Sequence, residues 1–212
     1  AGHPVFTDVS LKAGIGAHGF ALGLVVADIN RDGWKDIYVA NDFLSADELY
    51  INNGNGTFSN KRDVYFKHTS QNAMGTDIAD INNDGLADVL TVDMNPEGNL
   101  RKKKNMGNSN NAVVQSMIKG AYALQYVRNT LQVNQGPVIG NNDTIGDPVF
   151  SDMGFYAGVA ETDWSWTPSL ADFDNDGLRD IIITNGYPRD VTDHDFLVYH
   201  QNSYKTATKQ EL

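Results

Sequence analysis

The chain contains no cysteine, which excludes disulfides, thiolate zinc sites, iron–sulfur clusters and cysteine nucleophiles. Basic residues are also few: 16 Lys and Arg stand against 27 Asp and Glu, so the formal net charge is −11. Such a charge repels nucleic acids and anionic membranes, and it attracts cations. No run of residues approaches the roughly 18 apolar residues that a membrane-spanning helix needs. The sequence opens at Ala1 without Met or an apolar leader, so we expect a processed or shortened chain whose export signal is not visible.

An internal repeat dominates the 212 residues that are present. Three segments align without gaps: 27–37, 79–89 and 171–181, each of the form Ala-Asp-x-x-x-Asp-Gly-x-x-Asp-x. Their first aspartates lie 52 and 92 residues apart. A second marker follows the same spacing, because a Phe precedes each of these aspartates by 22 residues, at Phe6, Phe58 and Phe150. This agreement of independent markers indicates one repeating structural unit.

The longer second repeat differs from the first by two insertions. The segment 49–54, Leu-Tyr-Ile-Asn-Asn-Gly, recurs as Leu-Gln-Val-Asn-Gln-Gly at 131–136. The position of this marker places 30 of the 40 additional residues before it and 10 after it. The unit therefore has a period of 52 residues.

Each unit is predicted to form four short strands. In the first unit these are 21–27, an apolar run typical of a strand buried on both faces, then 37–40, 48–52 and 57–59. The last two are joined by Gly-Asn-Gly, a strong signal for a hairpin. Four-stranded units repeated every 40 to 50 residues are typical of the blades of a β-propeller.

We therefore predict an all-β fold of about 3 to 3.5 four-stranded blades, forming part of a propeller as a single domain over residues 1–212. The predicted parts are an outer strand near 5–10, a full blade over 20–63, a second blade over 74–155 and half a third over 165–186. A helical insertion is expected at about 95–128, with a helix at 112–118, and a helical tail at about 190–212 with Thr192 or Asp193 as its N-cap. Propellers have four to eight blades, so this chain is expected to be a piece of a larger propeller or to close its ring through another copy.

The acidic segments have the spacing of calcium loops. Side-chain oxygens at positions 1, 3, 5 and 9, with the backbone carbonyl of position 7, converge on one point, and Gly at position 6 permits the sharp turn. Hard oxygen ligands in this number suit calcium, whereas zinc prefers nitrogen or sulfur and magnesium requires a stricter octahedron. We thus expect three Ca²⁺ sites. Their predicted ligands are Asp28, Asn30, Asp32, Trp34 and Asp36 in the first loop, Asp80, Asn82, Asp84, Leu86 and Asp88 in the second, and Asp172, Asp174, Asp176, Leu178 and Asp180 in the third.

Other kinds of acidic loop have different sequence signatures. An EF-hand carries a bidentate Glu at position 12, where this chain has Val39, Thr91 and Ile183. The thrombospondin type 3 repeat is rich in cysteine, which this chain lacks. Asp-x-Asn-x-Asp-Gly can also form a simple polar turn, and this alternative stays open for any single copy.

The blade sequence over 23–39 resembles the FG-GAP repeat of integrin α-subunit propellers. It is still more similar to the related VCBS repeats of the cartilage acidic protein (ASPIC and UnbV) group, as are the segments 49–58, 160–166 and 185–193. The resemblance implies a seven-bladed propeller, outside the cell or on its surface (periplasmic or outer-surface in a bacterium), with calcium loops joining the first two strands of a blade. It also implies a role in adhesion or interaction. The chain departs from that pattern because it has only three loops, and no ligand-binding residue carries over.

Three further features stand outside the loops. Trp164 and Trp166 precede the third loop, where at least one is expected in the core between blades and the other could stack on a sugar ring. The basic run 101–104 is expected to be a solvated insertion, with contact to a partner as the alternative. The acidic and His-containing cluster from Asp190 to His200, with Asp193, His194 and Asp195, is expected to cap a helix, with a further metal site or an acid/base pair as alternatives.

Two functions from different classes follow. The first is a calcium-stabilised propeller module that binds proteins or glycans and carries out no catalysis. Neither a nucleic-acid partner nor a membrane-spanning segment is expected for it. The alternative is a calcium-dependent polysaccharide lyase or hydrolase, for which the cluster at 190–200 is the visible candidate site. No nucleophile elbow, P-loop or dinucleotide fingerprint appears, and His3, His18 and His68 stand alone. A third possibility is that the partial arc associates with other copies.

Overall fold

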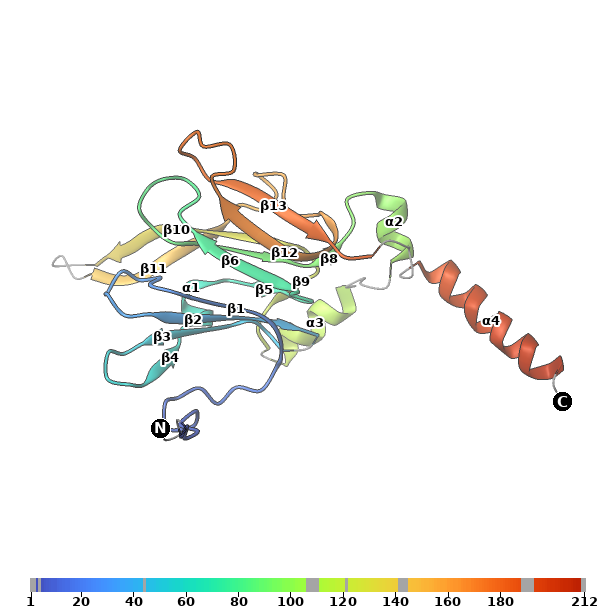
Figure 1. Ribbon diagram of the computed structural model, residues 1–212, viewed down its shortest axis with the longest axis horizontal. Coiled ribbons are helices and arrows are strands. Elements are labelled where there is room, and N and C mark those ends of the chain that lie inside the picture. The colour runs from blue at the N-terminus through green and yellow to red at the C-terminus, as the bar shows by residue number, and fades with distance from the viewer. Residues whose placement is uncertain are drawn as a thin grey trace.

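The computed structural model describes residues 3, 5–43, 45–105, 111–120, 122–140, 145–187 and 193–210. Strands dominate this part of the chain, and they are arranged in antiparallel sheets that stack on one another (Figure 1). The predicted all-β, propeller-like partial arc with small helices is confirmed.

The first sheet is the predicted first blade. Its strands follow one another in space as they do in the sequence: β1 (Phe20–Ala27), β2 (Asp36–Asp42), β3 (Glu48–Asn52) and β4 (Phe58–Asn60). All three pairings are antiparallel. The β3–β4 hairpin turns through Gly54 (φ +70°) and Gly56 (φ +83°), conformations in which an L-residue is strained.

The second sheet contains β6 (Gly75–Ala79), β7 (Asp88–Val92), β10 (Thr130–Ile139) and β11 (Ile145–Asp152), in that order across the sheet. The 30-residue insertion leaves the sheet between β7 and β10. It carries β8 (Met94–Asn95), α2 (Asn99–Lys104), α3 (Asn111–Lys119) and β9 (Gln125–Tyr126), so the predicted helix at 112–118 is confirmed. The 10-residue insertion extends the β10–β11 hairpin beyond the end of the sheet.

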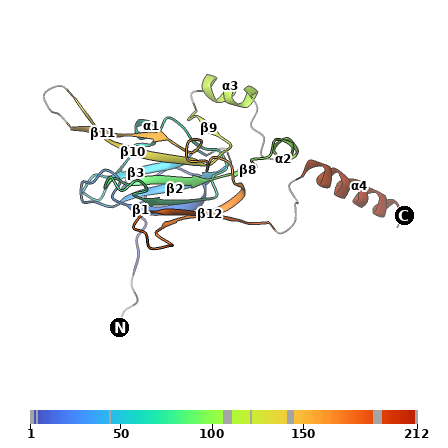
Figure 2. The ribbon, with the colours of Figure 1, turned by 90° about the horizontal axis from the view of Figure 1, so that it is seen from above.

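The third sheet is the predicted half blade, β12 (Asp163–Ala171) and β13 (Asp180–Asn185). Short β8 from the insertion pairs with the start of β12, an addition that the repeat pattern did not predict. Two further elements follow the first blade: α1 (Arg62–Tyr65) and β5 (Thr69–Ser70), which pairs in parallel with β9. The helical tail is α4 (His194–Gln210), and it extends away from the sheets (Figure 2).

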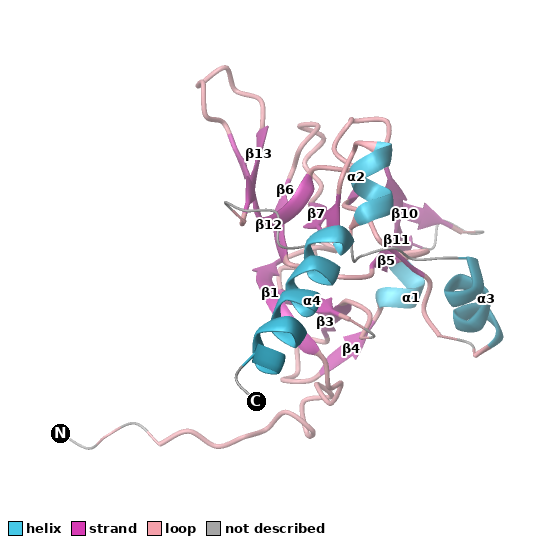
Figure 3. Ribbon diagram, turned by 90° about the vertical axis from the view of Figure 1, so that its right-hand side faces the viewer, coloured by secondary structure: helices cyan, strands magenta, loops and turns pink. Residues whose placement is uncertain are grey.

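The innermost strands of the three sheets lie side by side: β1 contacts β6, and β6 contacts β12 (Figure 3). Glycine permits this close approach, because a Cβ on Gly75 would lie 2.3 Å from the Trp166 carbonyl oxygen and one on Gly23 would lie 3.1 Å from the Gly75 Cα. The Leu170 amide of β12 also donates a hydrogen bond to Asp77 Oδ2 of β6 (2.7 Å). The three loops that follow these strands are therefore held next to one another.

Two apolar cores fill the spaces between the sheets. The first lies between the first and second sheets and includes Tyr38, Leu49, Phe66, Val89 and Phe150. The second lies between the second and third sheets, and its buried members are Leu90, Leu131, Val133 and Leu170. Each core thus joins two neighbouring repeats.

Two strand predictions at the start of the arc are wrong. The apolar run of β1 is not buried on both faces, because Leu22, Leu24 and Val26 are 51%, 63% and 51% exposed. Their counterparts on β6 and β12 face the preceding sheet, whereas the described residues place no sheet on this side of β1. For the same reason the expected strand near 5–10 has no edge to pair with, and residues 5–9 have no regular structure, with Phe6 90% exposed.

The basic run 101–104 is ion-paired rather than simply solvated, which corrects the prediction. Arg101 donates to both carboxylate oxygens of Asp163 (2.6 and 2.9 Å), and Lys102 pairs with Glu161. Lys104 contacts Asp195 at 2.6 Å, close to the start of α4. The insertion is thereby joined to the third sheet and to the helical tail. Among the described helices, none has the length and apolar character to cross a membrane.

Candidate metal centre

The three acidic loops lie between β1 and β2, between β6 and β7, and between β12 and β13; we call them loop 1 (28–36), loop 2 (80–88) and loop 3 (172–180). Their backbones are alike. Position 4 is left-handed in all of them, with φ of 62°, 58° and 64° at Arg31, Asn83 and Asn175. Position 6 is a glycine with φ of 84° to 89° in each loop. Only glycine adopts the latter values without strain, which is why the motif requires it.

The same hydrogen bonds close each loop. In loop 2 the Asp84 amide donates to Asp80 Oδ1 (3.1 Å) and Asn82 Oδ1 (3.2 Å), and the Gly85 amide donates to Asp80 Oδ2 (2.7 Å). The Leu86 amide then donates to Asp84 Oδ1 (2.8 Å). Loops 1 and 3 repeat all four bonds within 0.3 Å. The side chains at positions 1, 3 and 5 are thus turned toward the inside of one small loop.

The aspartate at position 9 joins each loop to the sheet. Asp36 accepts hydrogen bonds from the Ile29 amide and, across β2 and β3, from the Asn52 amide (both 2.8 Å). Asp88 makes the corresponding bonds with the Ile81 and Asn134 amides, also at 2.8 Å. In loop 3, Asp180 accepts only the first of these bonds among the described residues, from Phe173 at 2.9 Å, because no described strand pairs with the outer edge of β13.

Burial raises the pKa of Asp36 above its ordinary value, and the nearby carboxylates of Asp32 and Asp28 raise it further. The two backbone hydrogen bonds partly offset these effects. The pKa of Asp88 is raised for the same reasons, with Asp84 and Asp80 as its acidic neighbours. A bound cation would relieve the mutual repulsion of these carboxylates.

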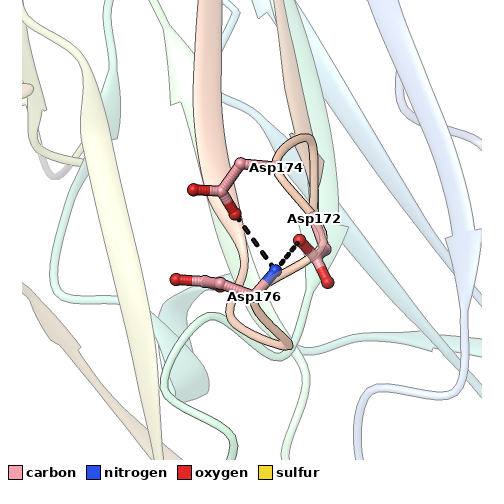
Figure 4. A group of neighbouring side chains, drawn as sticks. All are labelled: Asp172, Asp174 and Asp176. Carbon is pink, nitrogen blue, oxygen red and sulfur yellow. Dashed lines mark hydrogen bonds between the residues drawn. The ribbon is translucent and has the colours of Figure 1, made fainter.

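Loop 3 holds the densest cluster of carboxylates. One oxygen from each of Asp172, Asp174 and Asp176 lies within 4.8 Å of the others, and Figure 4 shows the three side chains around the Asp176 amide. Loops 1 and 2 have Asn at position 3, whose amide Nδ2 donates to the position 5 carboxylate at 2.9 Å in both. The side chains at positions 1, 3 and 5 of loops 1 and 2 therefore carry one negative charge fewer than those of loop 3, while the hydrogen bonds that fold the loop are the same.

The donor set fits calcium. Every side chain that points into these loops offers oxygen, and the carboxylates and amides are the hard ligands that Ca²⁺ prefers. The 15 predicted ligand residues are all described. Shared hydrogen bonds bring positions 1, 3 and 5 of each loop together, whereas the position 9 aspartates bond to other backbone amides, and the one in loop 3 lies outside the carboxylate cluster there. No histidine lies in any of the loops, so nitrogen-rich zinc coordination has no donors there.

A cavity of about 530 Å³ lies beside loops 1 and 2. Its wall combines loop residues such as Asn30, Arg31 and Leu86 with Tyr65 from α1 and Asp147 from the extended hairpin. Asp147 is held by Lys61 (3.0 Å) and accepts a hydrogen bond from the Tyr65 hydroxyl (3.4 Å). Mixed polar and apolar walls of this size are typical of sites for small molecules.

The remaining candidates from the sequence have structural contacts. Asp193 Oδ1 accepts the Asp195 amide (2.7 Å), as expected of the N-cap of α4, and the ring of His200 lies against Phe196. Asp190 and Thr192 lie outside the described residues. Trp164 and Trp166 are both half-buried and both contact the Tyr187 ring.

One histidine was misjudged from the sequence. His68 does not stand alone: its Nε2 lies 2.9 Å from Asp152 Oδ2, and Arg128 contacts both side chains. Burial opposes ionisation of Asp152, but the hydrogen bonds from His68 and the Gly154 amide and the charge of Arg128 bring its pKa below the ordinary value. These residues are 60 to 84 positions apart along the chain from His68, so no local motif could have indicated the contact.

Two buried aspartates at the opposite ends of the strands were also missed. Asp47 is fully buried and accepts hydrogen bonds from the Tyr38 hydroxyl (2.6 Å) and the Asn41 amide (2.9 Å). Burial raises the pKa of Asp47 to about 7. Asp93, held by the amides of Gln71, Asn72 and Met94, has a pKa that burial raises to about 6.

Comparison with known families found a match, which covers loops 1 and 2. Residues 28–91 match the FG-GAP-like repeat. The matched range runs from the first aspartate of loop 1 through loop 2 to β7. FG-GAP repeats are typical of integrin-like propeller modules that interact with ligands, are generally non-catalytic, and are typical of extracellular proteins. A search of curated proteins found no match for the chain.

Proposed function

We propose that this chain is a calcium-binding propeller module that interacts with a protein or a glycan outside the cell, and that it is related to the VCBS repeats of the ASPIC and UnbV group. The observation that carries the proposal is the identical geometry of three loops whose inward-facing side chains offer only oxygen donors. Calcium is the cation that this donor set fits.

In this proposal calcium acts on the geometry of the blades. Positions 1, 3 and 5 of each loop hold the ion, and the position 9 aspartate connects the loop to the third strand in the first two blades. A bound ion supplies positive charge where carboxylates otherwise repel one another. The chain's own residues then keep the first two strands of each blade in register and support the surfaces beside the loops.

The cavity beside loops 1 and 2 supports a role in ligand binding. The Arg31 guanidinium offers hydrogen-bond donors, and Leu86 and Pro137 supply apolar contact. A polysaccharide lyase or hydrolase is less well supported, because in the described part of the expected catalytic cluster Asp193 caps α4 and Asp195 pairs with Lys104. The half-buried tryptophans also contact Tyr187 rather than standing free for a sugar ring.

The exposed face of β1 suits contact with another blade of the same kind. Leu22, Leu24 and Val26 occupy the register positions at which β6 and β12 pack against the preceding sheet. At the other end of the arc, Ile182 is 45% exposed, whereas its counterparts Tyr38 and Leu90 are buried. We include association of copies through these two faces, head to tail, in the proposal.

The test is a titration of chelator-treated protein with calcium by calorimetry, with thermal melts recorded alongside. We expect three bound ions. An ion present at a hundred times its Kd stabilises the fold by about 2.7 kcal/mol for each site. Asp80→Ala should lower the bound number to two and reduce the melting temperature in calcium by about 5 to 10 °C, with a smaller loss in chelator. An absence of binding heat together with an unchanged melt would show that the loops are polar turns.

A ligand screen tests the interaction role separately. Immobilised glycans and extracellular matrix proteins would be probed in calcium and in chelator. We expect binding that depends on calcium and that weakens in Arg31→Ala. Turnover of an acidic polysaccharide would instead support the enzymatic alternative.

A further inference from the structure

One buried side chain, Asn134 of β10, joins loop 1 to loop 2. Asn134 is 2% exposed. Its backbone amide donates to Asp88 Oδ1 of loop 2 (2.8 Å), and its side-chain Oδ1 accepts the Gly136 amide (2.9 Å). The side-chain Nδ2 lies 3.4 Å from two carbonyl oxygens, those of Ala87 in loop 2 and Ile29 in loop 1. A single amide group therefore bonds to both loops.

The contact reaches the position 9 aspartates of both loops. Ile29 is fully buried in the core between the first two sheets, and its amide donates to Asp36 Oδ2. A chain of hydrogen bonds thus runs from Asp36 through Ile29 and Asn134 to Asp88. All four residues are buried, so solvent does not compete for these bonds.

The equivalent residue in the first repeat provides an internal comparison. Asn52 makes the same bonds within its own blade: its amide donates to Asp36 Oδ1, its Nδ2 donates to the Lys35 carbonyl (3.0 Å), and its Oδ1 accepts the Gly54 amide (3.0 Å). The described residues show no bond from Asn52 to another loop. The contact between loops is thus specific to Asn134, while the contacts within a blade are shared.

We propose that loops 1 and 2 bind calcium with positive cooperativity and that Asn134 transmits the coupling. The inference rests on the proposed function. Calcium in loop 2 would hold Asp88 and hence the Asn134 amide in place, which fixes the Ile29 carbonyl at the start of loop 1. Loop 1 then loses less conformational freedom when it binds its own ion. By reciprocity, loop 1 strengthens loop 2 by the same factor.

The experiment is a double-mutant cycle on calcium affinity. Asp84→Ala disables loop 2, and the affinity of loop 1 is then measured by calorimetry with calcium alone. With Asn134 present, we expect this change to weaken loop 1 by about 5- to 10-fold, at the low end of typical coupling between sites. In Asn134→Ala, loss of loop 2 should leave the affinity of loop 1 unchanged.

Matched variants separate coupling from general destabilisation. Asn52→Ala removes the equivalent side-chain bonds within a blade and should keep the cooperativity. Asn134→Ser keeps a side-chain oxygen near the Gly136 amide and removes the amide donor without adding a charge, so it replaces Asn134→Ala if that variant fails to fold. If every variant bound calcium with the same loop 1 affinity, the proposed coupling would be wrong while the proposed calcium binding would stand. No calcium binding in the wild-type protein would overturn both the proposed function and this inference.

Discussion

At the scale of single residues, one oxygen distinguishes loop 3 from the other two loops. Asp174 stands where loops 1 and 2 have Asn30 and Asn82, and its Oδ1 accepts the same backbone amide as theirs. Calcium affinity rises with the number of charged ligands. Loop 3 is therefore expected to bind calcium most tightly.

Asp174→Asn tests this charge effect without changing the fold of the loop. The amide oxygen can still accept the Asp176 amide, so the variant should keep three sites while the tightest becomes similar to the other two. Calorimetry in calcium measures this directly. The complete loss of one site, or an unchanged tightest site, would contradict the prediction.

A second residue-scale property is the buried carboxyl group of Asp47, whose pKa of about 7 lies well above the ordinary value of 3.8. Between these values the folded protein holds a proton that the unfolded chain has released, so this group lowers stability as the pH rises from about 4 to 7. Above pH 7 the cost of the buried charge is fully present. Asp93, at about 6, acts in the same direction over a narrower interval.

Asp47→Asn should therefore gain stability over the wild type as the pH increases. The difference in unfolding free energy should grow by about 1 kcal/mol for each pH unit between pH 5 and 6.5, close to the limit of about 1.4 for one proton. Chemical denaturation in chelator at several pH values measures it. Parallel stability curves for the two proteins would show that Asp47 does not titrate in this interval.

At the scale of elements, ion pairs hold the insertion against the third sheet. Arg101 of α2 binds both carboxylate oxygens of Asp163, and these hydrogen bonds lower the pKa of Asp163. The Lys104–Asp195 pair is more exposed, since the Asp195 side chain is 77% accessible. Bidentate pairs are geometrically specific, whereas exposed single pairs contribute little.

Arg101→Ala is thus expected to reduce the free energy of unfolding by about 1 kcal/mol, and Lys104→Ala, the matched control, by less than about 0.5. The contribution of Arg101 should fall at high salt and as the pH decreases through the lowered pKa of Asp163, because protonation removes the charge. Denaturation of both variants at low and high salt measures this. Equal losses for the two variants would show that the bidentate geometry adds nothing.

At the scale of the whole molecule, the two ends of the arc differ from its interior. Leu24 on the free face of β1 is 63% exposed, whereas Ile78 on β6, on the corresponding side of the next sheet, packs against the first core. A charge at Ile78 would be buried, and one at Leu24 would not. Substitutions at these two positions therefore distinguish an effect on association from an effect on folding.

Leu24→Lys should leave the melting temperature nearly unchanged and abolish association, while Ile78→Lys should destabilise the fold by about 3 kcal/mol or more. Light scattering over a range of concentrations measures the mass. We expect the wild-type protein to exceed the 23.2 kDa of one chain and the Leu24 variant to approach it. A wild-type mass of 23.2 kDa at every concentration would contradict association through this face.

Much of the architecture was predictable from the sequence because it repeats. Spacing alone located the blades at 20–63, 74–155 and 165–186, and the predicted third strand coincides with β3 (Glu48–Asn52). The residues that could hold calcium were predictable for a related reason. The loop pattern is local, so the side chains at positions 1, 3 and 5 bond to the same backbone amides in every copy whatever surrounds them.

What the tertiary structure alone decided depends on residues far apart in the sequence. The stacking of the sheets decides which blade faces are covered. It also brings Arg101 and Lys102 to their ion-pair partners, His68 to Asp152, and Asn134 to loops 1 and 2. Periodicity predicted that β1 is apolar, but the free end of the arc leaves one of its faces exposed. The physical reason is that a local pattern sets the conformation and donors of a segment, whereas burial and long-range contacts depend on which other segment packs against it.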